Sequence, residues 1–141
     1  MTDRAVDLAL DALRHRDLSE QELDRKLAAR GVAEGDRASA VETLRRTGLL
    51  DELRFARGRA ATLASRGAGN AFVRDALRRA GVSTEIVEAA IEELASEAER
   101  AGVIVASRGT SARTARYLAG KGFAPDTVAA VLGHDGRGEL G

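Results

Sequence analysis

Leu27-Ala28-Ala29-Arg30-Gly31-Val32 is the stretch of sequence that decides the fold, because its pattern occurs three times. An apolar residue is followed four positions later by glycine and then by another apolar residue. The other two copies are Leu77/Gly81/Val82 and Leu118/Gly122/Phe123. The three glycines are 50 and 41 residues apart, and self-similarity at such spacings is typical of tandem helical repeats. Repeats often build extended binding surfaces, so the pattern favours a binding protein over an enzyme.

Helix-start signals divide the chain into three units of three helices. Ser19-Glu20-Gln21-Glu22 is a capping box, in which the serine hydroxyl and the Glu22 carboxylate satisfy free backbone amides. Caps are predicted for four further helices, at Asp51, at Asn70, at Ser83 or Thr84, and at Ser111. Helices should also start at about Asp36, at Glu97, and near Pro125, which fits a first helical turn. The first helix should run from about Asp3 to His15, with Val6, Leu10 and Leu13 on its buried face. We expect repeats at 1–50, 51–96 and 97–134, a flexible tail at 135–141, and an all-α, elongated tandem array of three three-helix repeats.

One segment departs from this regularity. Residues 97–108 should form a helix, either separate from or continuous with the preceding one, but they contain the β-branched run Val103-Ile104-Val105. No alternation of strands and helices is present, which argues against a doubly wound or barrel fold.

Composition bounds the function. The 141 residues are 44% hydrophobic and 31% charged, which is typical of a globular chain. No cysteine is present, which excludes disulfides, thiolate metal sites and a cysteine nucleophile. No signal segment precedes the first helix, and no apolar run approaches the roughly 20 residues that span a bilayer. We expect a cytoplasmic monomer that makes no membrane contact.

No convergent set of catalytic or metal-binding groups can be assembled. His15 lies four residues after Asp11 as a surface pair, and His134-Asp135 lacks further ligands at metal-binding spacing. Glu92 and Glu93 point about 100° apart on a helix. The glycine-rich stretch Arg66–Asn70 follows no predicted strand and lacks a Gly-Lys-Ser/Thr sequence, so helix closure and an asparagine cap explain it better than a phosphate loop. We expect no enzyme activity, no cofactor and no metal.

Charge is strongly segregated although the net charge is zero. Residues 53–84 carry a net charge of +6, residues 85–99 carry −6, and residues 100–121 carry +5. Blocks of this kind suit charged partners; alternatively, they neutralise one another across packed helices.

Ten basic residues in the two positive blocks are candidates for binding a partner or DNA. With few carboxylates nearby in the sequence, they should offer guanidinium faces to phosphates or to an acidic protein surface. Tyr117, next to one of them, is a candidate for stacking on a base, with core packing as the alternative. The ten are Arg54, Arg57, Arg59, Arg66, Arg74, Arg78, Arg79, Arg113, Arg116 and Lys121.

Three phrases resemble the RecX family of regulatory proteins. They are Ser19–Leu23 continuing through Lys26-Leu27 and Gly31, the run Gly48–Arg57, and Tyr117-Leu118 followed by Lys121-Gly122-Phe123. Their order and spacing extend the resemblance over roughly residues 5–132.

This resemblance implies an elongated array of three three-helix repeats that binds the recombinase RecA and its filament on single-stranded DNA. Such a protein limits filament extension, ATP hydrolysis and strand exchange, and it is a modulator rather than an enzyme. The neutral net charge indicates that free single-stranded DNA is bound weakly or through the filament. The alternative is a stand-alone helical nucleic-acid-binding protein without a recombinase partner.

Overall fold

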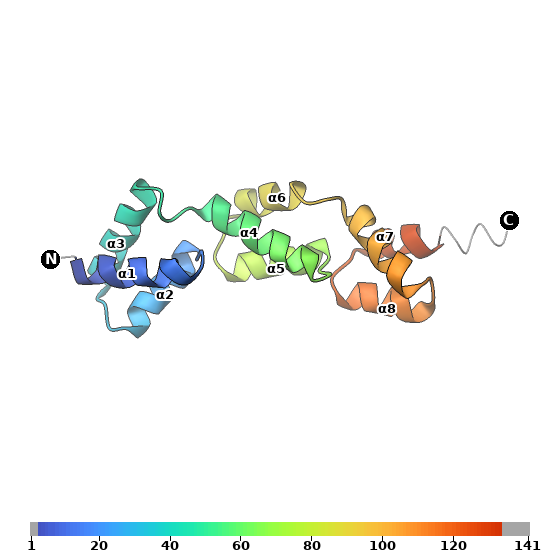
Figure 1. Cartoon of the computed structure of the whole chain (residues 1–141), viewed down its shortest axis with the longest axis horizontal. Helices are drawn as coiled ribbons and strands as arrows, with labels where there is room; N and C mark the ends of the chain where they lie inside the picture. Colours follow the sequence, from blue (N-terminus) through green and yellow to red (C-terminus); the bar gives the residue numbers. More distant parts are fainter. Residues whose placement is uncertain (1–2, 134–141) are drawn as a thin grey trace.

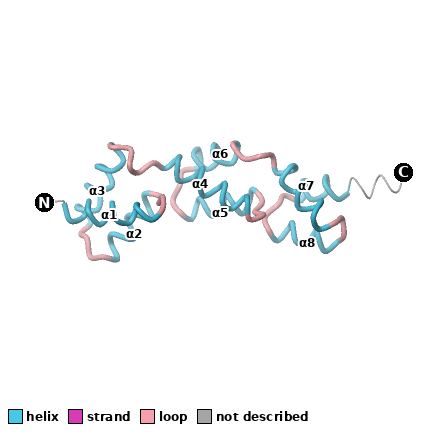
Figure 2. Tube along the Cα trace, in the orientation of Figure 1, coloured by secondary structure: helices cyan, strands magenta, loops and turns pink. Residues whose placement is uncertain are grey.

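A computed structural model describes residues 3–133, and every regular element in that range is a helix. Three groups of helices follow one another along the long axis of the molecule, with the two ends of the chain at opposite ends (Figure 1). Short loops connect the helices throughout (Figure 2). The predicted all-α array of three three-helix repeats is confirmed.

The first repeat consists of α1 (Asp3–His15), α2 (Glu20–Ala29) and α3 (Glu34–Arg46). The predicted capping box is present: the amide of Glu22 donates to Ser19 Oγ (3.0 Å), and the amide of Ser19 donates to Glu22 Oε1 (3.3 Å). The third helix begins two residues earlier than predicted.

The buried face of α1 differs from the predicted one. Ala5 and Ala9 are buried, whereas Leu10 is 38% exposed. Val6 and Leu13 are partly buried beside them. The helix α1 therefore packs against the core through small alanine side chains, and Leu10 lies on its more exposed side.

The second repeat consists of α4 (Glu52–Ser65), α5 (Asn70–Arg79) and α6 (Thr84–Glu92). Asp51 and Ser83 cap α4 and α6 as predicted. The prediction for Asn70 is wrong, because Gly69 occupies the cap position and no side chain caps α5. Asn70 is the first helical residue, and its amide instead donates to the Glu97 carboxylate (2.7 Å).

The third repeat consists of α7 (Glu97–Arg108), α8 (Ala112–Gly120) and α9 (Pro125–Val128), which continues into the π-helical turn η1 (Ala129–Gly133). Non-helical residues separate α6 from α7, so these two helices are not continuous. The β-branched run lies within α7, where Ile104 and Val105 pack against the core and Val103 is 71% exposed.

The three glycines of the repeated phrase close α2, α5 and α8 in the same way. Gly31, Gly81 and Gly122 have φ angles of +83°, +87° and +91°, a conformation that glycine adopts at low cost. The residue after each glycine donates its amide to the leucine carbonyl five positions earlier, at 3.1 Å in all three copies. This is the Schellman arrangement, and it explains why the phrase is spaced as it is.

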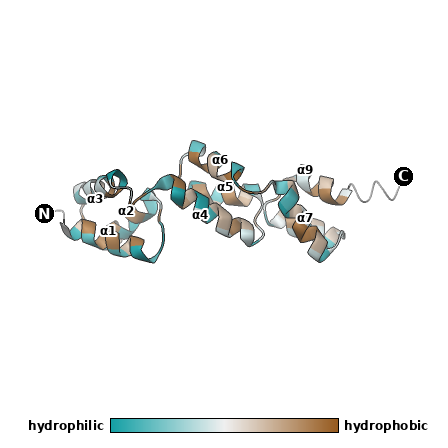
Figure 3. Ribbon diagram, turned by 45° about the horizontal axis from the view of Figure 1, so that its top comes forward, coloured by the Kyte–Doolittle hydropathy of each residue, from teal (hydrophilic) through white to brown (hydrophobic). Residues whose placement is uncertain are grey.

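Each repeat has its own cluster of buried residues. Figure 3 shows apolar and polar segments alternating along the helices, as amphipathic packing requires. The clusters centre on Leu23 and Leu44 in the first repeat, Val73 and Leu77 in the second, and Leu118 in the third. We propose repeat boundaries at 50/51 and 96/97, supported by the separation of these clusters; the predicted tail lies outside the described residues.

Adjacent repeats meet at two joints of the same design. A glutamate at the start of the next repeat's first helix accepts from the first amide of the preceding repeat's middle helix. Glu52 Oε1 accepts from the amide of Glu20 (2.9 Å), and Glu97 Oε2 accepts from that of Asn70. In addition, Ser19 Oγ donates to the carbonyl of Ala80 at the first joint (2.6 Å). The middle helices therefore join end to end along the array.

Candidate partner-binding surface

The positive and negative blocks of the sequence meet within the second repeat. Arg74 Nε and Nη2 donate to the two carboxylate oxygens of Glu88 at 2.7 and 3.1 Å, linking α5 to α6. Arg57 Nε donates to Glu93 Oε2 at 2.8 Å. The expectation that these arginines offer unoccupied guanidinium faces is therefore wrong, since helix packing brings acidic residues that are distant in the sequence against them. The alternative interpretation, internal neutralisation, applies here.

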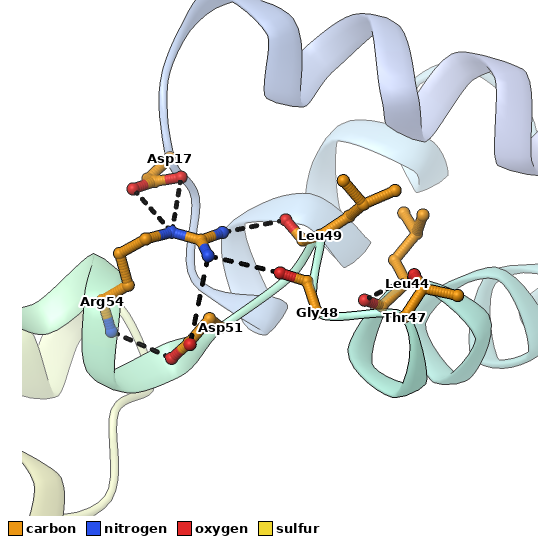
Figure 4. Close-up of polar contacts among 7 residues, drawn as sticks. All are labelled: Asp17, Leu44, Thr47, Gly48, Leu49, Asp51 and Arg54. Atoms are coloured by element: carbon orange, nitrogen blue, oxygen red, sulfur yellow. Dashed lines mark hydrogen bonds and ion pairs between the residues drawn. The ribbon is translucent and has the colours of Figure 1, made fainter.

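Arg54 connects the first two repeats through its side chain. Its Nη1 and Nη2 donate to the carbonyls of Gly48 and Leu49 at 3.2 and 3.0 Å, and its Nε lies 3.3 Å from Asp17 Oδ2 (Figure 4). Its backbone amide donates to Asp51, the cap of α4. With these contacts, Arg54 holds the α3–α4 connection against the α1–α2 turn.

Arg59 and Arg79 also have acidic partners. Arg59 Nη2 lies 3.5 Å from Glu22 Oε2, and its guanidinium covers the Phe55 ring at 4.8 Å. Arg79 pairs with Asp75 on its own helix at 3.0 Å, but its side chain is 80% exposed. Solvent screens such an exposed pair strongly, so Arg79 can exchange Asp75 for a partner's anion at small cost.

The other five predicted residues form no ion pair with any residue between 3 and 133. They are Arg66, Arg78, Arg113, Arg116 and Lys121.

Tyr117 is packed among cations. The guanidinium of Arg108 lies 3.5 Å from the centroid of its ring, and the Lys121 ammonium lies 6.0 Å from it. Arg108 thus covers the ring, and we favour packing over base stacking for Tyr117.

A basic groove brings together two of the predicted residues and one that the sequence did not indicate. Arg59 on α4 and Arg66, the residue that follows α4, line it with Arg16, from the loop before α2; its volume is about 550 Å³. Gly58 and Thr62 also line it, and its one acidic residue, Asp17, pairs with Arg54. Arg16 stands in a locally acidic stretch, so only the approach of the α1–α2 loop to α4 reveals it. The candidates on α5 and α8 do not line this groove.

The described part of the chain contains neither a candidate metal site nor a candidate membrane-spanning helix. Residues 3–133 contain no cluster of three or more His, Cys, Asp or Glu residues suited to a metal ion. No helix in that range is both long and apolar enough to cross a membrane. The predicted Asp11–His15 pair is replaced by an ion pair between Asp11 and Arg14 at 2.9 Å. His134 and Asp135 lie outside the described residues.

Two curated relatives match nearly the whole chain. The regulatory protein RecX of Chromohalobacter salexigens is 35% identical over 137 residues, covering 91% of this chain and 90% of its own length. That of Halorhodospira halophila is 32% identical and covers 96% and 92%. The chain belongs to the RecX family of regulatory proteins. A comparison with models of known protein families gave no match.

Solved RecX structures share the fold. The crystal structure of RecX from Lactobacillus salivarius matches with a TM-score of 0.81 at 16% identity, covering 94% of this chain and 95% of that one. Another regulatory protein RecX matches with a TM-score of 0.80 at 20% identity, covering 92% and 72%.

The family assignment settles the class of function. RecX proteins are regulatory proteins and not enzymes, and the family implies RecA as the partner, so this chain is a regulatory protein of that kind. The alternative of a nucleic-acid-binding protein without a recombinase partner is therefore set aside. None of these findings tests the individual binding residues, which stay a prediction.

Proposed function

We propose that this RecX protein inhibits RecA by contacting the filament through the basic groove formed by Arg16, Arg59 and Arg66. The observation that carries the proposal is the RecX match along about 90% of the chain, which includes all three repeats. The array is elongated, so several of its faces can lie along a filament at once.

The chemistry of the groove supports this role. Three guanidiniums and the Thr62 hydroxyl face a space whose one carboxylate already has a partner in Arg54. Guanidiniums bind phosphates and carboxylates through paired hydrogen bonds. The groove therefore suits either the DNA backbone inside the filament or an acidic stretch of the recombinase. Arg66, exposed and without an ion pair within residues 3–133, is the cation most available to it.

We further propose that the chain acts in the cytoplasm as a monomer and that protein contacts supply most of its affinity. The net charge of zero supports weak binding to free DNA, since phosphate contacts gain affinity from counterion release. Binding at the growing end of a filament would let one molecule prevent many later additions.

Gly58 offers a clean test of the groove. A Cβ atom added there would meet nothing within 4 Å, so Gly58→Glu introduces a carboxylate at the groove from an uncrowded position. Gly35→Glu is the matched control, because Gly35 also lies in a helix with open space around it but on α3. We expect Gly58→Glu to weaken inhibition of the RecA ATPase roughly tenfold, equivalent to about 1.4 kcal/mol.

Gly35→Glu should inhibit like the unmodified chain, and circular dichroism should show both variants folded. Equal inhibition by the two variants would remove the groove from the RecA interface.

A further inference from the structure

Phe72 has a large apolar side chain that is not part of the buried core of its repeat and does not cap its own helix. It is the third residue of α5 and is 47% exposed. The equivalent position holds Glu22 in the first repeat, where it completes the capping box, and the buried Thr114 in the third. Because α5 has no side-chain cap at all, the second repeat gives up a stabilising interaction at this position. The exposed phenylalanine ring is therefore available for contact with a partner.

The backbone beneath Phe72 is held firmly. The amides of Gly69 and Ala71 donate to the carbonyls of Lys121 and Gly122, at 2.8 and 3.1 Å. A Cβ atom on Gly122 would lie only 2.7 Å from the backbone nitrogen of Phe72, so the two segments are in close contact. The joint with the third repeat thus fixes the start of α5, and the ring extends from a preorganised support.

The ring lies in a groove with three arginines. This groove, of about 390 Å³, is lined by Phe72 and Arg79 of α5, Arg25 of α2 and Arg59 of α4. Its two acidic residues, Glu22 and Asp75, pair with Arg59 and Arg79. Arg25 is exposed and has no ion pair among residues 3–133. Because Arg59 also lines the basic groove defined above, an extended ligand could reach from one groove to the other.

An exposed aromatic ring among guanidiniums matches single-stranded nucleic acid. Unpaired bases stack on aromatic side chains whatever their identity, while arginines bind the phosphates on either side. An acidic peptide would use the arginines without needing the ring, and an apolar protein segment would use the ring without needing the arginines. A nucleotide strand carries a base and a phosphate at every residue, so it uses the ring and the arginines together.

We propose that Phe72 is a stacking platform for an unpaired base of single-stranded DNA and that Arg25 and Arg79 bind the adjacent phosphates. This deepens the proposed function, on which it rests, by naming a direct DNA contact at the junction of the first two repeats. DNA released or exposed at a filament end is single-stranded and would present such bases.

The chain contains no tryptophan, which permits a direct test. In Phe72→Trp the new indole is the single tryptophan of the protein, and stacking on a base quenches its fluorescence. An oligothymidylate of about 20 nucleotides is titrated at low salt without RecA. We expect quenching of Phe72→Trp with affinity retained, and roughly tenfold weaker binding for Phe72→Ala measured by anisotropy of labelled oligothymidylate. Leu49→Trp, at a position 51% exposed and outside the groove, is the control and should not be quenched.

Three results would overturn the inference: no binding of the oligonucleotide by the unmodified chain, equal binding by Phe72→Ala, or no quenching of Phe72→Trp. If Phe72→Ala loses RecA inhibition while its DNA binding is unchanged, the ring contacts protein instead. The proposed function is judged separately, by RecA inhibition with the unmodified chain. Stacking without inhibition would contradict that function and leave the DNA contact standing.

Discussion

Gly31 and Gly122 close equivalent helices with nearly the same backbone conformation, but their surroundings differ. A Cβ on Gly31 would meet nothing within 4 Å, whereas one on Gly122 would press against the backbone of Phe72. Both glycines avoid the strain of a positive φ, and Gly122 also allows close contact between the second and third repeats.

We therefore predict that Gly31→Ala lowers the free energy of unfolding by about 1 kcal/mol, the cost of the left-handed conformation alone. Gly122→Ala should cost at least about twice as much, because backbone cannot move aside as a flexible side chain can. Urea denaturation of both variants measures the difference. Equal losses would mean that the second joint is not closely packed.

Glu97 connects the second and third repeats through its carboxylate. Burial alone would raise its pKa, but hydrogen bonds from the Thr127 hydroxyl (2.6 Å) and the amides of Asn70 and Ala124 outweigh burial and lower the pKa below its ordinary value of 4.5. A carboxyl with a lowered folded-state pKa stabilises the fold above its unfolded pKa. That stabilisation is lost as the pH falls through the folded value.

Glu97→Gln should accordingly lower the free energy of unfolding by about 1–2 kcal/mol at pH 7. The difference from the unmodified chain should shrink as the pH falls below about 4.5, the unfolded value. Urea denaturation at pH 7 and pH 3.5 measures both quantities, with Glu92→Gln, at an exposed position, as the control. A difference that does not change with pH would contradict the role assigned to the ionised carboxylate.

At the scale of the helices, two serines occupy equivalent caps with different surroundings. Ser19 caps α2, is fully buried, and donates its hydroxyl to the carbonyl of Ala80 in the next repeat. Ser111 caps α8, is exposed, and forms the cap alone. One hydroxyl therefore stabilises a helix and a joint, and the other only a helix.

Ser111→Ala should cost about 1 kcal/mol, the usual value of a cap. Ser19→Ala should cost about 2–3 kcal/mol, because it also leaves the Ala80 carbonyl buried without a donor. Thermal and urea unfolding of the pair test this difference. A similar cost for both would show that the first joint contributes little stability.

The sequence predicted those elements whose signals are local. The Schellman glycines, the Ser19 capping box and Pro125 act within a few residues of themselves, so the helix order and most helix ends were predicted correctly. The role of Asn70 was not predicted correctly. Gly69 occupies the cap position instead, and the amide of Gly69 donates to the carbonyl of Lys121 in the next repeat. Likewise, the partners of Arg57 and Arg74 and the place of Arg16 depend on how helices far apart in sequence pack.

At the scale of the whole molecule, stability is distributed unevenly along the array. Among the described residues, the third repeat has three buried apolar residues in its core, against ten in the first repeat and eleven in the second. Close helix packing occurs mainly within repeats, so each repeat depends largely on its own core and on its joints.

We predict that the amides of α7 and α8 exchange with deuterium before those of α5 and α6, because local opening follows the amount of buried apolar contact. Hydrogen exchange followed by mass spectrometry at the peptide level gives the order directly. Simultaneous exchange of all three repeats would instead mean that the array unfolds as one cooperative unit.

The shape of the molecule connects its structure to regulation. An elongated array with two grooves at the junction of its first two repeats can contact a filament along its length, while ion pairs within the array occupy several of its arginines. The contacts required by a regulator of this kind are spread over helices and joints rather than gathered in one cleft.

The most direct test of this account is the single-stranded-DNA-dependent ATPase of the cognate RecA with the unmodified chain titrated in. The account predicts inhibition well below one molecule per RecA, as expected when binding at a growing end prevents many later additions. No inhibition at equal or excess stoichiometry, with the chain folded by circular dichroism, would contradict it.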